Sequence, residues 1–171
     1  SACEKAAQWH LALGLLAEMP SVSLVPNIVS YNAAISACGK AEQWESALAL
    51  LAEMPGVRLD PDVVSYTAAI SACERGRQWP SALLLLVGMP RVRVQPNIIS
   101  YTAAVSACRN SREWQLALKV LADMWQARLD AGALCYDAAV GACARATRRQ
   151  SALQLLAELP ADRQLRQQLC P

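Results

Sequence analysis

The chain has 171 residues, of which 54% are hydrophobic, and its formal net charge is +2. A charge this small does not by itself indicate a nucleic-acid partner, although a repeat array can gather its few cations on one face. No run of about 18 uncharged apolar residues occurs, so we expect no membrane insertion.

Residues 1–27 are expected to form a partial repeat: the end of one helix, then a complete helix from Trp9 to Met19. Apolar residues in this second helix follow the i, i+4, i+8 spacing of a buried face; they are Leu11, Ala12, Leu15, Leu16 and Met19. Pro20 is expected to stop the helix. The extended linker over residues 25–27 follows from Pro26, because the residue before a proline avoids the helical region.

The segment from Ile28 to Asp62 is the unit that the rest of the chain repeats, with a period of 35 residues. A fixed period of this size is typical of solenoids and other repeat arrays. Ser1-Ala2-Cys3 matches a point inside this unit, so we expect the chain to be a piece of a longer protein. After the partial repeat, the expected units are the repeats 28–62, 63–97 and 98–132, and a degenerate repeat with a C-terminal tail over 133–171.

Each repeat is expected to be a pair of helices. In the first full repeat the pattern predicts helix A from Ile28 to Lys40, with Ser30 able to cap its start, and helix B from Trp44 to Met54. Pro55-Gly56 is expected to end helix B. Two helices of about a dozen residues joined by a short turn make a helical hairpin, so we predict an all-α fold.

Several residue types recur on the period and are expected to pack in the core. The cysteines are predicted to be unpaired structural thiols in a reducing compartment, because equivalent sites in successive repeats lie about 8–10 Å apart, too far for a disulfide. The tyrosines are expected to pack between repeats rather than form a base-stacking ladder, and the tryptophans to lie between helices A and B. These residues are Cys3, Cys38, Cys73, Cys108 and Cys143; Tyr31, Tyr66, Tyr101 and Tyr136; Trp9, Trp44, Trp79 and Trp114.

No catalytic or metal-binding motif is present. There is no Ser/His/Asp arrangement, no HExxH, no phosphate-binding loop and no CxxC pair, and His10 is the only histidine. We therefore expect no enzyme activity, catalytic residue, metal, cofactor or small-molecule substrate.

Four cations share one position of the period, near the end of helix A. They form a candidate contact surface for phosphates, and Asn110 interrupts the row. The alternative is that they are solvated charges favoured by the helix dipole. The four residues are Lys5, Lys40, Arg75 and Arg145.

The repeat has a recognisable motif: Val-Ser-Tyr-Asn opens helix A, Ala-Leu-x-Leu-Leu-x-x-Met fills helix B, and Pro-Asp closes the unit. It resembles the P-type repeat of the pentatricopeptide repeat (PPR) family, over essentially the whole chain. The tryptophan in helix B and the many alanines look like an algal variant. The resemblance implies a right-handed α-solenoid of antiparallel helix-turn-helix repeats that binds single-stranded RNA, with one base read per repeat.

The resemblance also implies which side chains read the bases. Asn32 with Asp62 looks like a uracil reader and Thr67 with Asn97 an adenine reader, so the chain would read a 5′-UA step. For Asn32 and Thr67 the alternative is local capping or turn hydrogen bonding. Weaker pairs are Thr102 with Gly132, which leaves at best a purine preference, and Asp137 with Gln167, which fits no familiar pairing. The branched residues expected to sandwich the bases are Val29, Val64 and Ile99.

Two functions follow as expectations from the family. The first is RNA binding in organellar RNA processing, stability or translation. The second is a protein-binding scaffold in an organellar ribosome, photosynthetic complex or respiratory complex. The location in a chloroplast or mitochondrion is implied by the resemblance alone.

Overall fold

The computed structural model describes residues 2–111, 113–129 and 133–145. All regular elements in these ranges are helices, which confirms the predicted all-α fold. The α-helices are α1 (Ala2–Glu18), α2 (Ile28–Lys40), α3 (Trp44–Glu53), α4 (Val63–Arg75), α5 (Trp79–Gly88), α6 (Ile98–Asn110), α7 (Trp114–Gln126) and α8 (Ala133–Arg145). Short 3₁₀ helices follow three of them: η1 (Met19–Val22), η2 (Met54–Val57) and η3 (Met89–Val92).

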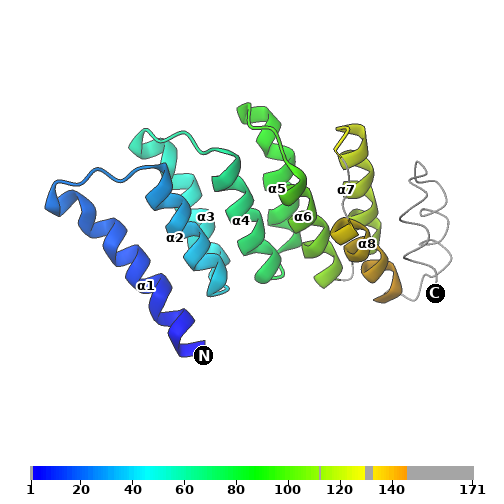
Figure 1. The fold of residues 1–171 in the computed structure, drawn as a ribbon, viewed down its shortest axis with the longest axis horizontal. Coiled ribbons are helices and arrows are strands. Elements are labelled where there is room, and N and C mark those ends of the chain that lie inside the picture. Colours follow the sequence, from blue (N-terminus) through cyan, green and yellow to red (C-terminus); the bar gives the residue numbers. More distant parts are fainter. Residues whose placement is uncertain (1, 112, 130–132, 146–171) are drawn as a thin grey trace.

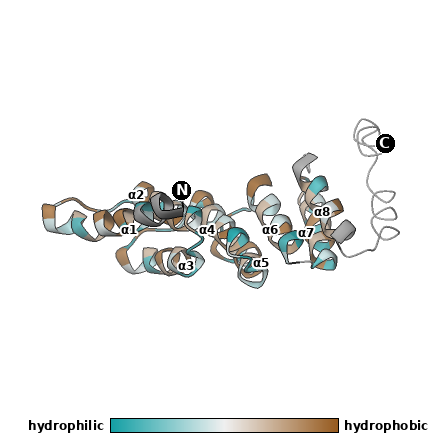
Figure 2. Cartoon of the chain, turned by 90° about the horizontal axis from the view of Figure 1, so that it is seen from below, coloured by the Kyte–Doolittle hydropathy of each residue, from teal (hydrophilic) through white to brown (hydrophobic). Residues whose placement is uncertain are grey.

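The helices form two layers. The helix-A layer consists of α2, α4, α6 and α8, each packed against the next (Figure 1). The helix-B layer consists of α3, α5 and α7, each packed against helix A of its own repeat and of the following one. Figure 2 shows α2 and α4 on one side of the molecule and α3 and α5 on the other. This arrangement is the predicted α-solenoid, and its helix-A layer is the more closely packed.

Each helix A in the full repeats begins with a capping box. The side chains of Asn27, Asp62 and Asn97 accept hydrogen bonds from the backbone N–H groups three residues later, at 3.0, 2.8 and 2.9 Å. The serine at that third position accepts a hydrogen bond from the backbone of the cap in return. Ser30 therefore takes part in the cap of α2 as predicted, as the third residue of the capping box and not as the N-cap itself. Asn27 is the cap, because it is the extended residue whose side chain reaches the free N–H groups.

The α-helix of helix B in the first full repeat ends at Glu53, directly before Met54-Pro55, as predicted. Pro55-Gly56 lies inside η2, a short 3₁₀ helix that follows α3 directly. Proline fits the start of this turn because its missing N–H is not needed there. The residue in the left-handed conformation is Arg58, with φ 60°. In α7, Trp125 replaces the proline and the α-helix runs on to Gln126.

Residues 2–18 form one helix, so the expected turn between two helices before Trp9 is absent. Ala6 and Ala7 stand where later repeats turn, and alanine is the strongest helix former. Of the predicted buried stripe, Leu16 lies in the core and Met19 packs against it. Leu11 and Leu15 are instead 64% and 56% exposed, because α1 packs on α2 through another side. No helix within the described ranges is both long and apolar enough to cross a membrane.

The periodic cysteines and aromatic residues pack as predicted wherever their side chains are described. Cys38, Cys73 and Cys108 are fully buried and unpaired. The four periodic tryptophans pack, partly buried, against the two apolar clusters of the core. Tyr31 is buried and its hydroxyl donates to Glu53 at 3.1 Å, whereas Tyr66 packs against both clusters and so joins successive repeats. The predictions for the side chains of Cys3, Tyr136 and Cys143 lie outside the described residues.

Candidate nucleic-acid interface

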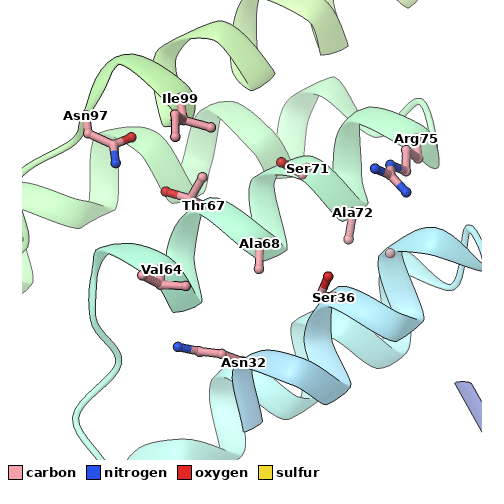
Figure 3. A pocket seen from close by; sticks show the side chains of 11 residues that line it. Asn32, Ser36, Val64, Thr67, Ala68, Ser71, Ala72, Arg75, Asn97 and Ile99 are labelled. Atoms are coloured by element: carbon pink, nitrogen blue, oxygen red, sulfur yellow. The ribbon is translucent and has the colours of Figure 1, made fainter. Parts of the chain in front are cut away.

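A groove of about 340 Å³ lies on the helix-A layer between α2 and α4, and the first turn of α6 closes one end (Figure 3). It is lined by residues from three successive repeats. Most of the predicted base-reading and base-sandwiching residues of the two complete pairings meet there, together with one predicted phosphate contact. These lining residues are Asn32, Val64, Thr67, Arg75, Asn97 and Ile99.

The predicted uracil pair is joined by a hydrogen bond. Asn32 Nδ2 donates to Asp62 Oδ1 at 3.4 Å. The same carboxylate oxygen accepts from the backbone N–H and the hydroxyl of Ser65, at 2.8 and 3.0 Å. Asn32 Oδ1 is buried and has no partner among the described residues. Asp62 therefore both caps α4 and positions Asn32, while Asn32 keeps a buried acceptor without a partner in the described residues.

The ionised form of Asp62 is the favoured one. Burial alone would raise the pKa of its carboxyl group, but the hydrogen bonds from Ser65 and Asn32 outweigh burial and lower the pKa. A stable anionic acceptor thus lies beside the amide of Asn32, which lines the groove, although Asp62 itself is not a lining residue.

The two residues of the predicted adenine pair both line the groove, and no hydrogen bond joins them in the described residues. Thr67 Oγ1 is buried and without a partner in the part of the chain that the structure describes. Asn97 uses its Oδ1 to cap α6, accepting from the Ser100 backbone at 2.9 Å. Figure 3 shows Thr67 and Asn97 near each other at one end of the groove. The side chains of Asp62 and Asn97 cap helices. Those of Asn32 and Thr67 do not, so the local capping considered as the alternative to base reading does not explain these two residues.

Thr102 differs from Thr67 and does not line the groove. Its hydroxyl donates to the Ile98 carbonyl at 2.7 Å and lies 2.7 Å from Cys135 Sγ. Cys135 occupies the position of the capping-box serine in the other repeats, and burial raises the pKa of its thiol. Both predicted partners of the weaker pairs, Gly132 and Gln167, lie outside the described residues. Asp137 is exposed on α8.

The three branched residues predicted to sandwich bases are exposed on the helix-A layer. Val29, Val64 and Ile99 are 69%, 55% and 62% exposed, although they are apolar. Val64 and Ile99 border the groove on both sides of Thr67 (Figure 3), and Val29 lies one repeat earlier. These side chains offer apolar surface at the spacing of the repeat.

Among the predicted phosphate contacts, Lys40 and Arg75 are exposed, and Arg75 lies at the opposite end of the groove from Asn97 (Figure 3). The side chains of Lys5 and Arg145 lie outside those described. One further cation, Arg109, was not predicted from the sequence. It lies one residue before Asn110, the residue that interrupts the basic row. Its Nε is buried without a partner in the described ranges, and its side chain passes close to Gly141 of α8. No periodicity argument finds it, since it lies one residue out of register.

The described residues contain no group of three histidine, cysteine or acidic side chains placed to bind a metal ion. The acidic residue nearest to the basic row is Glu74. Burial raises the pKa of its carboxyl group, and the charges of Arg75 and Arg109 oppose that rise only in part.

Family models match most of the chain. One described as the pentatricopeptide repeat domain matches residues 1–41 and 84–146, which is more than half of the sequence. One described as the PPR repeat family matches residues 26–75, and one described as the PPR repeat matches residues 64–94. No curated protein matches the chain.

Solved structures share the fold. The pentatricopeptide repeat protein PPR10 from maize is 23% identical, with a TM-score of 0.78, and the match covers 91% of this chain and 22% of that one. The same protein in complex with an 18-nt psaJ RNA element is 22% identical, with a TM-score of 0.75, over 86% of this chain and 22% of that one. The PPR domain of Arabidopsis thaliana protein-only RNase P 1, in complex with tRNA, is 15% identical, with a TM-score of 0.76, over 98% of this chain and 91% of that one.

Proposed function

The chain belongs to the pentatricopeptide repeat family, and on this premise we propose that its helix-A layer binds single-stranded RNA and reads one base at each complete repeat. The groove between α2 and α4 carries the proposal, because it gathers the side chains that the family pattern assigns to base reading. The RNA complexes of the maize and Arabidopsis proteins, which share this fold, support it.

The chemistry of the two pairs fits different bases. The Asp62 carboxylate accepts hydrogen bonds only, so with Asn32 it suits the N–H and carbonyl groups on the edge of uracil. Thr67 can donate and accept, and Asn97 has a free amide donor, which together suit the ring nitrogen and amino group of adenine. Val29, Val64 and Ile99 provide apolar surface against the faces of the bases.

Lys40 and Arg75 supply the charge for the RNA backbone in this proposal. Both are exposed on the helix-A layer, one repeat apart. Lys5 and Arg145 extend the row at the same position of the period. Contacts of this kind release counterions, so they make binding depend on salt.

We place this RNA binding in an organelle, in the processing, stability or translation of transcripts, because the family works there. The chain acts in this proposal as a binding module without catalytic activity of its own. It spans 22% of the length of the maize protein, so the activity and targets of the whole protein depend on parts beyond it.

A change of the uracil pair tests the assignment. Replacing Asn32 by Thr and Asp62 by Asn copies the pair Thr67–Asn97, and Asn already caps α2 and α6 in this chain. Binding of the double variant to RNAs that differ at one position is measured by fluorescence anisotropy. Preference at that position is expected to move from uracil to adenine. An unchanged preference would overturn the assignment of these two residues.

A second candidate, docking of a protein, is favoured by one observation on the helix-B layer. Leu84 and Val87 of α5 are 75% and 59% exposed, where α3 carries Ala49 and Ala52. No charged residue occurs in α5, and the exposed Arg91 follows in η3. The charge and the apolar surface suit an acidic amphipathic helix of a partner protein.

Docking on the α5 surface can be tested by replacing Leu84 and Val87 with alanine, the residue that α3 carries at both equivalent positions. The double variant Leu84→Ala, Val87→Ala is expected to keep its fold and its affinity for RNA. It is expected to lose at least tenfold in affinity for a designed acidic amphipathic peptide. Equal binding of the peptide by both proteins would exclude this surface.

A further inference from the structure

Two serines that line the groove have no role predicted from the sequence. Ser36 lies one helical turn after Asn32 on α2, and Ser71 lies one turn after Thr67 on α4; both line the groove. One turn further on, each helix carries its predicted phosphate contact, Lys40 or Arg75. Residues four apart share a face of a helix and rise by about 6 Å. Each helix therefore presents a base reader, a serine and a cation in a row, as Figure 3 shows for Thr67, Ser71 and Arg75.

The hydroxyls of these two serines are free to bind a ligand. Neither Ser36 nor Ser71 makes a side-chain hydrogen bond within the described residues, although both are half-buried. The hydroxyls of Ser65 and Ser100, by contrast, are committed to the capping boxes, and that of Thr102 to the Ile98 carbonyl. The groove thus holds two unpartnered hydroxyls between its base readers and its cations.

The order of groups along each helix matches the order of groups in a nucleotide. A base held at Thr67 and a phosphate held at Arg75 leave the sugar in between, at Ser71. The ribose 2′-hydroxyl donates and accepts hydrogen bonds, as serine does, and DNA lacks it. We propose that Ser36 and Ser71 contact the 2′-hydroxyls of the bound strand and so select RNA over DNA; the proposal rests on the proposed function.

The other repeats show where this contact is lost. On α6 the serine is kept as Ser106, which is 9% exposed, but Asn110 replaces the cation. On α8 the serine position is Gly141, over which the side chain of Arg109 passes. The complete row of reader, serine and cation is therefore found on α2 and α4, the helices whose base readers form complete pairs.

Packing is the competing explanation for a small residue at these positions. The layer is tight here, since a Cβ added to Gly39 would lie 3.1 Å from the Cβ of Ala72. Alanine keeps the small size and removes only the hydroxyl. The double variant Ser36→Ala, Ser71→Ala therefore separates the two explanations, and its melting temperature should stay at the wild-type value.

The experiment compares the full chain with this double variant on two matched strands. One is a single-stranded RNA with a central UA step, and the other is DNA of the same sequence with deoxyuridine in place of thymidine. The variant Ser46→Ala, Ser81→Ala is the control, because these serines lie one period apart on helix B, outside the groove. A hydrogen bond contributes about 0.5–1.5 kcal/mol, so two contacts are expected to favour RNA by roughly 5- to 150-fold.

The wild type and the control are expected to prefer RNA by this factor. The groove variant is expected to lose affinity for RNA but not for DNA, so that its preference falls to about onefold. RNA preference that survives in the groove variant, or equal binding of RNA and DNA by the wild type, would overturn the proposal while RNA binding stands. A wild type that binds neither strand would overturn the proposed function itself.

Discussion

Asp62 has two roles in this structure. It caps α4 through the Ser65 backbone, and it accepts a hydrogen bond from Asn32, its predicted partner in base reading. A base that binds here meets a carboxylate whose position is already fixed by the start of the next helix. The base reading proposed for this site is thus coupled to the fold of the following repeat.

The lowered pKa of Asp62 predicts how stability depends on pH. A carboxyl group whose pKa is lower in the folded chain than its ordinary value of 3.8 stabilises the fold above that value. This contribution is lost as the pH falls through the folded pKa. Thermal unfolding of the wild type and of Asp62→Asn, measured from pH 7 to pH 3, is expected to show a stability difference that shrinks in the acid range. A difference that stays constant over that range would contradict the coupling.

Neighbouring repeats meet closely at the turn between helices A and B. A Cβ added to Gly76, which follows α4, would lie 2.4 Å from Cδ1 and 2.8 Å from Cγ of Trp44 on α3. The Cβ of Trp44, which would lie 3.0 Å away, is fixed by the backbone of α3, so the contact is relieved only if the indole rotates and the helix shifts. Gly76 therefore makes room for the tryptophan of the preceding repeat.

Replacing Gly76 by Ala is expected to destabilise the chain by about 1–3 kcal/mol, because it overpacks this contact. Gly56→Ala is the matched control, since an added Cβ there meets nothing within 4 Å and its φ is not positive. The control is expected to be neutral or more stable by up to about 1 kcal/mol. Urea unfolding of both variants gives the comparison, and a Gly76→Ala variant as stable as the control would refute the account of this contact.

The sequence allowed the helical hairpins and most of the groove to be predicted, because both depend on the 35-residue period. Residues that repeat at equal positions occupy equal environments, as the buried cysteines and the exposed Val29, Val64 and Ile99 show. Local departures were missed because they depend on geometry that the period does not encode. The left-handed conformation falls on Arg58 and not on Gly56, and Arg109 lies out of register.

The use of Thr102 shows a second limit of sequence reasoning. Thr67 and Thr102 are equivalent by period, yet only Thr67 faces the groove with a free hydroxyl. The difference arises in the next repeat, where Cys135 replaces the serine of the capping box and approaches Thr102. Whether a base reader is available thus depends on its neighbour.

Across the whole molecule, the solenoid offers one continuous helix-A layer that carries the two complete pairs proposed to read bases. Its net charge of +2 is small, so attraction to RNA depends on where the cations lie. Lys40 and Arg75 lie on this layer, and the exposed apolar surface of α5 lies on the other. The two layers are thereby suited to different partners.

Binding of single-stranded RNA across a salt series tests whether the helix-A layer reads RNA. A pool of strands with UA steps is compared with a pool that lacks them. The UA pool is expected to bind more tightly. The logarithm of the binding constant is expected to fall linearly with the logarithm of the salt concentration. The expected slope is roughly −1.4 for two phosphate contacts, or roughly −2.8 for four. No binding at low salt, or equal and salt-independent binding of both pools, would contradict the proposal that this layer reads RNA.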